Sequence, residues 1–256
     1  MSDLAPLFDP EQIRFSGSRN SWFLYRFNEL DSTSDYLHSR TDSMPDRSVV
    51  MADSQTAGRG RMGRSWASPQ GGLYASILLR PGPPLENASR LALLIADLVC
   101  DLLGESGISG LIKWPNDVIV GGRKLAGILS ESGNYPGPWM IAGLGMNVAH
   151  LPGIPDSRGL PPGHWGGFAQ PPLPVEILRN LLERLDAAWP DRNMDPIGQR
   201  LESIGSRLWC RGQLVRIVRG PETATGTVTG IDQEGHLLIV TSSGTRSFDS
   251  GELRPV

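Results

Sequence analysis

The side chains best suited to chemistry lie in one loop, which runs from Gln55 to Trp66 and alternates glycine with arginine. Glycine lets backbone amides approach an anion closely, and a guanidinium binds a carboxylate or phosphate through two parallel hydrogen bonds. The pattern predicts a loop that closes over an anion. A solvated basic surface loop is the alternative, but the strand-like runs Val49–Ala52 and Leu73–Leu79 on either side favour an ordered site.

The segment Gly58–Gly63 also satisfies the dinucleotide-binding pattern G-x-G-x-x-G. That fingerprint must open a helix, because the helix N-terminus binds the pyrophosphate. Here Pro69 and the pair Gly71–Gly72 follow and interrupt any helix. The sequence therefore argues against a Rossmann-type site.

A second group of polar residues surrounds the corner Lys113-Trp-Pro-Asn116-Asp117, which lies between two apolar runs. Gly121–Gly122 suits a two-residue type I′ or II′ turn, which would place Asp117 near Lys124 across a hairpin. An exposed cross-strand ion pair contributes only about 0.2–1 kcal/mol. Two lysines and a carboxylate around one corner indicate the edge of an active site more than a stabilising pair.

Two further stretches complete the expected site. Trp22–Phe27 reads as a strand that leads into a helix start, where Ser32 and Asp35 form a capping box. Its amides and hydroxyls suit the neutral, amide-like head of a ligand, although Ser32 capping its own helix is an equal alternative. In the strand Met140–Val148, glycines two residues apart would let a ligand lie flat against the sheet.

The remaining elements indicate an α/β (α+β) fold, a mixed sheet with flanking helices. Helices are expected over Leu85–Leu103, Val175–Trp189 and Pro196–Ile204, with an irregular connection over Leu151–Pro174. Short strands after Arg207 predict a small SH3-like barrel. We therefore expect an N-terminal segment (1–20), a catalytic domain (21–206) and a C-terminal domain (207–256).

Composition narrows the class of protein. The net charge of −3 over 256 residues argues against a dedicated nucleic-acid binder. Cys100 and Cys210 lie far apart, and the four histidines lack the spacing of a metal site. Met1–Asn20 lacks the features of a signal peptide, and the apolar run Leu91–Leu103 is too short to cross a bilayer. We expect a cytoplasmic protein with no membrane partner.

Together these motifs resemble the biotin protein ligases. The resemblance rests on Gln55-Thr-Ala-Gly-Arg-Gly-Arg-x-Gly-Arg-x-Trp66, Gly72-Leu-Tyr74, Lys113-Trp-Pro-Asn-Asp117, Lys124-Leu-Ala-Gly-Ile128 and Gly143-x-Gly-x-Asn147. It implies a class II synthetase-like catalytic domain. It also implies a two-step reaction, in which biotin and MgATP give biotinyl-5′-AMP and the biotinyl group then passes to a lysine of a biotin carboxyl carrier protein.

The resemblance also implies roles for individual residues. Catalysis would rest on Arg59, Arg61, Lys113, Asp117 and Lys124. Biotin would be bound by Ser32, Thr33, Gln55, Gly58, Arg59, Arg61, Tyr74, Lys124, Gly127 and Gly145. ATP would be bound by Arg61, Met62, Gly63, Arg64, Trp66, Asn116, Lys124 and Asn147. Magnesium would arrive with ATP, without a site made of protein groups alone.

Two positions depart from the family's pattern: Ser34 replaces the usual asparagine after Ser-Thr, and Met62 replaces a common arginine. The stretch before Trp22 is too short for a winged-helix domain, so the sequence predicts a monofunctional enzyme without DNA binding, as a monomer or weak homodimer. The nearest alternative is a lipoate or octanoate ligase-like acyltransferase, which also acts on a carrier lysine. A non-enzymatic RNA- or DNA-binding module is the alternative from another class.

Overall fold

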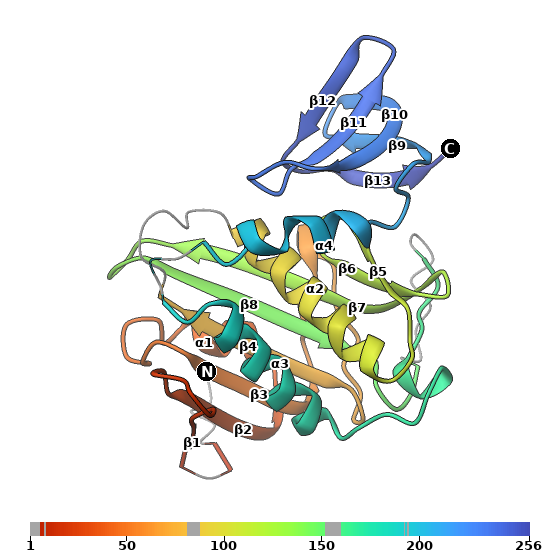
Figure 1. The fold of residues 1–256 in the computed structure, drawn as a ribbon. Coiled ribbons are helices and arrows are strands. Elements are labelled where there is room, and N and C mark those ends of the chain that lie inside the picture. The colour runs from red at the N-terminus through yellow and green to blue at the C-terminus, as the bar shows by residue number, and fades with distance from the viewer. Residues whose placement is uncertain (1–5, 8, 81–87, 152–159, 192, 194) are drawn as a thin grey trace.

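The computed structural model describes residues 6, 7, 9–80, 88–151, 160–191, 193 and 195–256. In these residues the chain forms two sheets (Figure 1). The larger has eight strands in the order β1-β2-β3-β4-β8-β7-β6-β5. Its strands are β1 (Glu11–Ile13), β2 (Trp22–Leu30), β3 (Ser48–Gln55), β4 (Leu73–Leu79), β5 (Gly110–Lys113), β6 (Asp117–Val120), β7 (Arg123–Gly133) and β8 (Trp139–Met146). The sheet is mixed as expected, because β2 and β3 are parallel and the other neighbours antiparallel.

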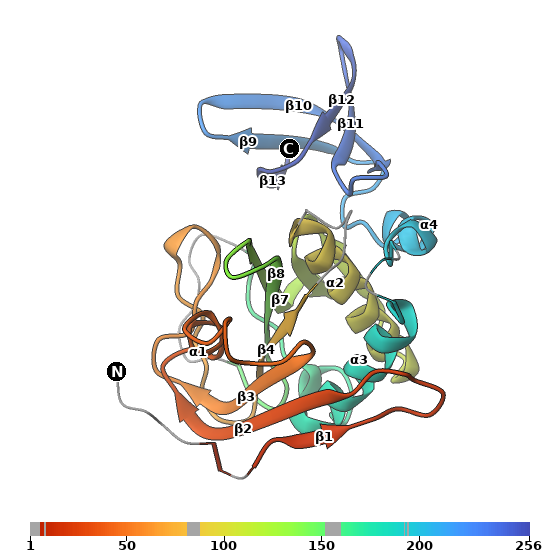
Figure 2. The same ribbon diagram turned by 90° about the vertical axis from the view of Figure 1, so that its left-hand side faces the viewer.

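Helices cover both faces of this sheet unequally. Figure 2 shows α1 (Thr33–His38) on one face and α2 (Ala88–Glu105) with α3 (Pro174–Ala188) on the other. A helix is expected over Leu85–Leu103, and its first three residues, 85–87, lie outside the described residues. Residues 152–159 of the irregular connection expected over Leu151–Pro174 also lie outside them. Short helical turns complete the set: η1 (Arg61–Gly63), η2 (Trp165–Gly167), η3 (Gly198–Arg200) and α4 (Leu201–Ser206).

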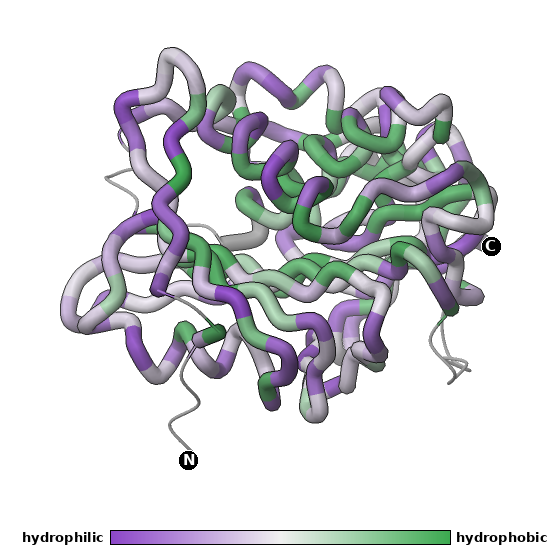
Figure 3. Tube along the Cα trace, turned by 90° about the horizontal axis from the view of Figure 1, so that it is seen from below, coloured by the Kyte–Doolittle hydropathy of each residue, from purple (hydrophilic) through white to green (hydrophobic). Residues whose placement is uncertain are grey.

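The alternation of side chains along β4 and β8 explains this arrangement. Ile77, Ala142 and Leu144 point to the face that packs on α2 and α3, in the main hydrophobic core. Leu78 and Ile141 point to the opposite face, where a smaller cluster packs under α1. Figure 3 shows the hydrophobic segments concentrated along the central strands and the helices that cover them. Because α1 is short, it leaves part of its face to the arginine–glycine loop.

The second sheet is antiparallel, with the strand order β12-β11-β10-β9-β13. Its strands are β9 (Leu214–Arg219), β10 (Glu222–Ile231), β11 (Leu237–Thr241), β12 (Gly244–Phe248) and β13 (Glu252–Pro255). Sequence analysis missed β13, a short strand that ends in proline, and β1. The first and last strands in the order are not paired with each other in the described ladders, so the SH3-like barrel stays a prediction.

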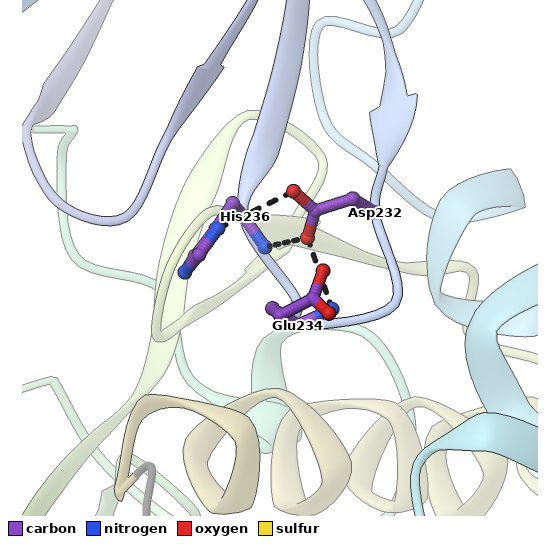
Figure 4. Close-up of side chains that lie close together, drawn as sticks. All are labelled: Asp232, Glu234 and His236. Atoms are coloured by element: carbon purple, nitrogen blue, oxygen red, sulfur yellow. Dashed lines mark hydrogen bonds and ion pairs between the residues drawn. The ribbon is translucent and has the colours of Figure 1, made fainter.

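The C-terminal sheet is joined to the corner between β5 and β6. Ile112 of β5 exchanges backbone hydrogen bonds with the linker, to Arg207 O and from Trp209 N, each 2.8 Å long. Trp114 Nε1 donates to Gly235 O at 3.0 Å in the turn between β10 and β11. Figure 4 shows how that turn is held: Asp232 accepts the backbone N–H groups of Glu234 and His236. The C-terminal sheet therefore contacts the segment that carries Lys113 and Asp117.

A buried ion-pair cluster supports the same linker. Asp97, fully buried on α2, accepts hydrogen bonds from Arg207 at 2.6 Å and Arg200 at 2.5 Å. Burial alone would raise the pKa of nearby Asp101, but hydrogen bonds from the same two arginines bring it below its usual value. None of the helices in the described residues is long and apolar enough to cross a membrane.

Candidate active site

The register of the large sheet places five of the expected site residues in one row. Tyr74 of β4 lies opposite Gly145 of β8, which lies opposite Gly127 of β7. Gly127 in turn lies opposite Asp117 of β6, and Asp117 opposite Lys113 of β5. Directly opposed residues share a face of a sheet. The row therefore runs across five strands on the face that carries α1.

Trp66 of the loop lies flat on the two glycines of this row. A Cβ atom at Gly145 would lie 2.5 Å from Trp66 Nε1, and one at Gly127 would lie 3.2 Å from Trp66 Cζ3. Only glycine allows such close approach of a ring to the backbone. The indole N–H is buried without a hydrogen-bond partner in the described residues. The expected flat surface for a ligand thus exists, and in this conformation Trp66 covers it.

A β-bulge brings Lys124 to the same face as Gly127. They are three positions apart, so a regular strand would point them to opposite faces, but the register shifts between Val118 and Ile119. Lys124 Nζ consequently lies 2.9 Å from Asp117 Oδ1 and 5.2 Å from the centre of the Trp66 ring. The hairpin turn is as expected, since Gly121 and Gly122 both have positive φ, of 55° and 73°.

Arg61 supplies a second cation beside Asp117. Its NH1 donates to Asn116 Oδ1 at 3.0 Å, and burial lowers its pKa although Asp117 raises it. Asn116 is held by the corner itself, because its side-chain amide donates to Ile128 O at 2.9 Å. A desolvated guanidinium and an ammonium around one carboxylate form a cationic end to the glycine row, and the proximity of Lys124 to Asp117 is as the sequence predicts.

The loop around these residues folds back on itself. Gly60 N donates to Arg64 O at 2.7 Å, and Trp66 N donates to Gly58 O at 2.8 Å. At Gly58 a Cβ atom would lie 2.4 Å from Trp66 O, so the close approach requires glycine. At the tip, Met62 is 84% exposed and adjoins Gly63, so it contacts little of the row in this conformation.

Arg59 lies apart from the other expected cations. It forms ion pairs with Asp35 of α1 at 2.7 Å and with Glu131 of β7 at 2.9 Å. Burial lowers the pKa of Arg59, but the two carboxylates raise it by a larger amount, so the pKa lies above its ordinary value. His38 contacts the other oxygen of Glu131 at 3.0 Å. In this conformation Arg59 therefore ties the loop to the scaffold, and its expected role at the phosphates stays a prediction.

The opposite end of the site is neutral and buried. Ser32 caps α1 by accepting the N–H of Asp35 at 3.3 Å, which confirms the expected helix start. Gln55 Oε1 accepts from Thr33 N at 2.9 Å and lies 3.1 Å from Thr33 Oγ1. Ser76 of β4 also contacts Thr33 here. Sequence analysis did not single out Ser76, although a polar residue inside the apolar run 73–79 was the available signal.

Two expected residues have structural partners that account for their burial. The hydroxyl of Tyr74 donates to Pro69 O at 2.8 Å, and burial raises its pKa to about 12. Asn147 Nδ2 donates to Gly163 O at 2.9 Å and so fixes the segment after β8. Tyr74, at one end of the row, and Asn147, just after β8, thus hold the segments at Pro69 and Gly163.

Comparison with known proteins identifies the family of this chain. The profile of the "Biotin/lipoate A/B protein ligase family" matches residues 27–142, and that of the "Biotin protein ligase C terminal domain" matches 212–253. Among solved structures, the biotin protein ligase of Aquifex aeolicus in complex with biotin and ATP superposes with a TM-score of 0.79. It is 29% identical, and the match covers 91% of this chain and 99% of that one.

Two curated relatives give the same result from sequence alone. The biotin–[acetyl-CoA-carboxylase] ligase of Paracoccus denitrificans is 32% identical over 80% of this chain and 88% of its own length. The bifunctional ligase/repressor BirA of Bacillus subtilis is 32% identical over 88% of this chain and 71% of its own length. Both matched domains, the shared fold and the sequence relatives agree, and the chain belongs to the biotin protein ligase family.

Proposed function

We propose that this protein activates biotin with ATP and transfers the biotinyl group to a specific lysine of a biotin carboxyl carrier protein. Relatives from Paracoccus denitrificans and Mycobacterium tuberculosis are named biotin–[acetyl-CoA-carboxylase] ligases, each 32% identical. The observation that carries the proposal is the arrangement of the site: the row ends in cations on one side, and a group of neutral residues around α1 and Ser76 lies beside Tyr74 at its other end. A ligand with a neutral ring and a carboxylate tail fits such a row.

The first step joins two anions. An oxygen of the biotin carboxylate attacks the α-phosphorus of ATP, the bond from that phosphorus to the bridging oxygen breaks, and pyrophosphate leaves with the electron pair. Each pair of unit charges brought to about 4 Å costs roughly 4 kcal/mol at an effective dielectric near 20. Arg61 and Lys124 offset this repulsion, and Lys113 stands at the end of the same row. Orientation and charge then suffice, without a protein nucleophile.

In the second step the neutral amine of the carrier lysine attacks the acyl carbon of biotinyl-5′-AMP. The amide bond forms, the bond from the acyl carbon to the phosphate oxygen breaks, and AMP leaves while the amine loses a proton. Water must be kept from the same carbon. Trp66, which in this conformation lies on Gly145 and Gly127, is the side chain best placed to cover the intermediate.

The site residues divide between the two ends of the ligand in this proposal. Ser32, Thr33 and Gln55 bind the ureido ring, because all three are neutral and rich in hydrogen-bonding groups, and Ser32 and Thr33 are buried. Lys124 and Arg61 bind the acyl carboxylate and the α-phosphate. Gly58, Gly63 and Arg64 shape the loop over the phosphates, and Arg59 would join them only by leaving Asp35 and Glu131.

Magnesium fits this site only as an ion carried by ATP. Among the described residues near the cations, Asp117 is the one carboxylate in the row, and Lys124 already contacts its Oδ1. The described groups that cluster closely enough to chelate an ion are Asp232, Glu234 and His236, in the turn of the C-terminal sheet. Bound with ATP, the ion would neutralise phosphate charge, and Asp117 would offer it one oxygen.

Finer features of the molecule remain part of the proposal. The class II synthetase-like catalytic domain is an expectation from the resemblance. The SH3-like closure of the C-terminal sheet, the domain boundaries at 21 and 207, a monomer or weak homodimer, and the lack of DNA binding are predictions from the sequence. We also propose that the C-terminal sheet acts near the nucleotide or the carrier protein. Its contact with the corner that holds Lys113 and Asp117 supports this role.

Biotin-dependent exchange of radiolabelled pyrophosphate into ATP tests the first step. We expect exchange with biotin and none with lipoate or octanoate at the same concentration. Transfer is tested by mass spectrometry of an added biotin carboxyl carrier domain, with its acceptor lysine replaced in the control. Exchange that depends on lipoate instead of biotin would refute the proposal in favour of the lipoate-type acyltransferase.

A further inference from the structure

A chain of short polar side chains lies beneath α1, at the neutral end of the site. Ser76 is fully buried on β4, and its hydroxyl oxygen lies 2.8 Å from Thr33 Oγ1 and 2.9 Å from Ser34 Oγ. Beyond Thr33 the chain continues to Gln55 Oε1. Ser34 is itself buried, with 5% of its surface exposed.

Elementary hydrogen-bond accounting fixes the direction of every bond in this chain. The backbone N–H of Thr33 only donates, so the Gln55 atom that it contacts is the carbonyl oxygen. At its other end the Gln55 amide donates to Ser68 Oγ at 2.8 Å, which gives the same orientation. A carbonyl oxygen has no hydrogen, so the hydroxyl of Thr33 must donate to it.

Each hydroxyl has one hydrogen, and the remaining directions follow from that limit. Thr33 has used its hydrogen on Gln55, so Ser76 donates to Thr33. Ser76 has then used its own, so Ser34 donates to Ser76. Ser34 therefore directs its only hydrogen into the protein and has only lone pairs left for another partner. Ser32, by contrast, accepts the N–H of Asp35 and keeps a hydrogen to donate.

Ser34 also lies beside the surface on which the ligand is expected. A Cβ atom at Gly143 would lie 2.5 Å from Ser34 Oγ and 3.3 Å from Ser76 Oγ. Gly145, which contacts Trp66, follows two residues later on the same face of β8, about 6.8 Å away along the strand. Ser34 Oγ thus packs on Gly143, two residues before the glycine row on the same strand, beside the region where the neutral head of a ligand is expected.

We propose that Ser34 is a specificity-determining residue that accepts a hydrogen bond from one ureido N–H of biotin. The inference rests on the proposed function and deepens it. Ser34 stands where the family usually has asparagine, whose side chain both donates and accepts. A serine whose hydrogen is committed to Ser76 can only accept. It therefore favours a ring that donates N–H and disfavours a dithiolane or alkyl group, which has no hydrogen to give.

The test combines two variants with biotins methylated on one or the other ureido nitrogen. In the wild type, methylation of the nitrogen that faces Ser34 should weaken binding by about 10- to 100-fold, the range for leaving a buried polar group unpaired. Ser34→Ala should weaken the binding of biotin to a similar extent. In Ser34→Ala that methyl group should then add little further loss, measured by calorimetry on the folded proteins.

Ser76→Ala tests the direction of the chain. It frees the hydrogen of Ser34, so that Ser34 can donate as well as accept, and the selectivity against groups that lack an N–H should fall while biotin still binds. Ser34→Cys keeps the volume of the side chain with a weaker acceptor and should give an intermediate loss. Ser39→Ala, which removes an exposed hydroxyl at the end of α1 bonded to Tyr36 O, should change nothing.

The outcomes separate this inference from the proposed function. If the wild type shows no biotin-dependent pyrophosphate exchange, the proposed function is wrong and the inference falls with it. If exchange is normal but Ser34→Ala binds biotin as tightly as the wild type, Ser34 does not contact the ring. Additive losses from Ser34→Ala and from each methylation would also overturn the inference, because they would mark a structural effect.

Discussion

The two ends of the glycine row are built from opposite kinds of interaction. At the head-group end, Ser32, Thr33, Ser34 and Ser76 are neutral and almost fully buried. At the reacting end, Arg61, Asp117 and Lys124 carry charges, and 28% of the Lys124 side chain is exposed. One end offers hydrogen bonds of fixed direction, and the other offers charges that are held by protein partners.

This difference indicates which end is ready for its ligand. At the neutral end the hydroxyls of Thr33, Ser34 and Ser76 already form hydrogen bonds with one another without a ligand, so we expect this end to be preorganised and to select by hydrogen-bond direction. At the charged end Lys124 contacts Asp117 and Trp66, and Arg61 contacts Asn116. Those cations must exchange partners when phosphate binds. We therefore expect changes at the charged end to affect chemistry and changes at the neutral end to affect binding.

The largest predicted effect comes from Lys124→Ala. Loss of one group that stabilises developing charge typically reduces the rate by about 10²–10³, which corresponds to 2.7–4 kcal/mol. We expect pyrophosphate exchange to fall by this amount while the affinity for biotin changes little. Arg123→Ala, at the neighbouring exposed position, is the matched control. Exchange in Lys124→Ala close to that of the wild type would remove Lys124 from the proposed role and break the contrast between the two ends.

Gly145→Ala should have the next largest effect, because the new methyl group would meet the Trp66 ring 2.5 Å away. Overpacking of this kind destabilises by about 1–3 kcal/mol, so Trp66 should swing off the row. We expect adenylate formation to fall by roughly 10- to 100-fold, with a shift in tryptophan fluorescence. Gly104→Ala, on α2 with open space around its Cβ position, is the control. Unaltered fluorescence would show that Trp66 does not rest on Gly145 in solution.

Local patterns in the sequence were sufficient to predict most of the elements that carry this contrast. The strand Leu73–Leu79 has the predicted bounds, because its apolar residues are buried on both faces. The pair Asp117 and Lys124 followed from a two-residue turn alone. Ser32 as a helix cap followed from its position before Thr33 and three residues before Asp35. Each of these predictions depends on residues close together in the chain.

The features that sequence analysis missed depend on contacts between distant segments. The bulge at Leu125 brings Lys124 and Gly127 to one face, and no turn residue marks it. Arg59 pairs with Glu131, 72 residues away in the sequence. The composition of the loop could not reveal this partner and suggested only that Arg59 binds phosphate. Ser76 and Ser34 are brought together by packing α1 onto β4, and two serines in separate elements have no spacing to detect.

Trp114 links the charged end to the C-terminal sheet, and a smaller effect is predicted for Trp114→Phe. The change removes the N–H that Trp114 donates to Gly235 O at 3.0 Å in a buried position. Leaving that carbonyl unpaired should lower the free energy of unfolding by about 1–3 kcal/mol. We expect pyrophosphate exchange to fall modestly and the affinity for biotin to stay constant, measured by denaturation and calorimetry. A loss of biotin affinity would mean that the corner also supports the neutral end.

The smallest effect is predicted for Arg59→Ala. Arg59 holds Asp35 and Glu131 with 38% of its side chain exposed, and exposed ion pairs contribute only about 0.2–1 kcal/mol. We therefore expect pyrophosphate exchange in Arg59→Ala to fall by less than about fivefold, which corresponds to the upper end of that energy range. Exchange in Arg61→Ala should fall much further. Limited trypsin digestion adds an independent measurement, since loss of the tie to Asp35 and Glu131 should speed cleavage after Arg61 and Arg64. A loss in Arg59→Ala as large as that in Arg61→Ala would show that Arg59 leaves its carboxylates when ATP binds, and the charged end would then extend to the tip of the loop.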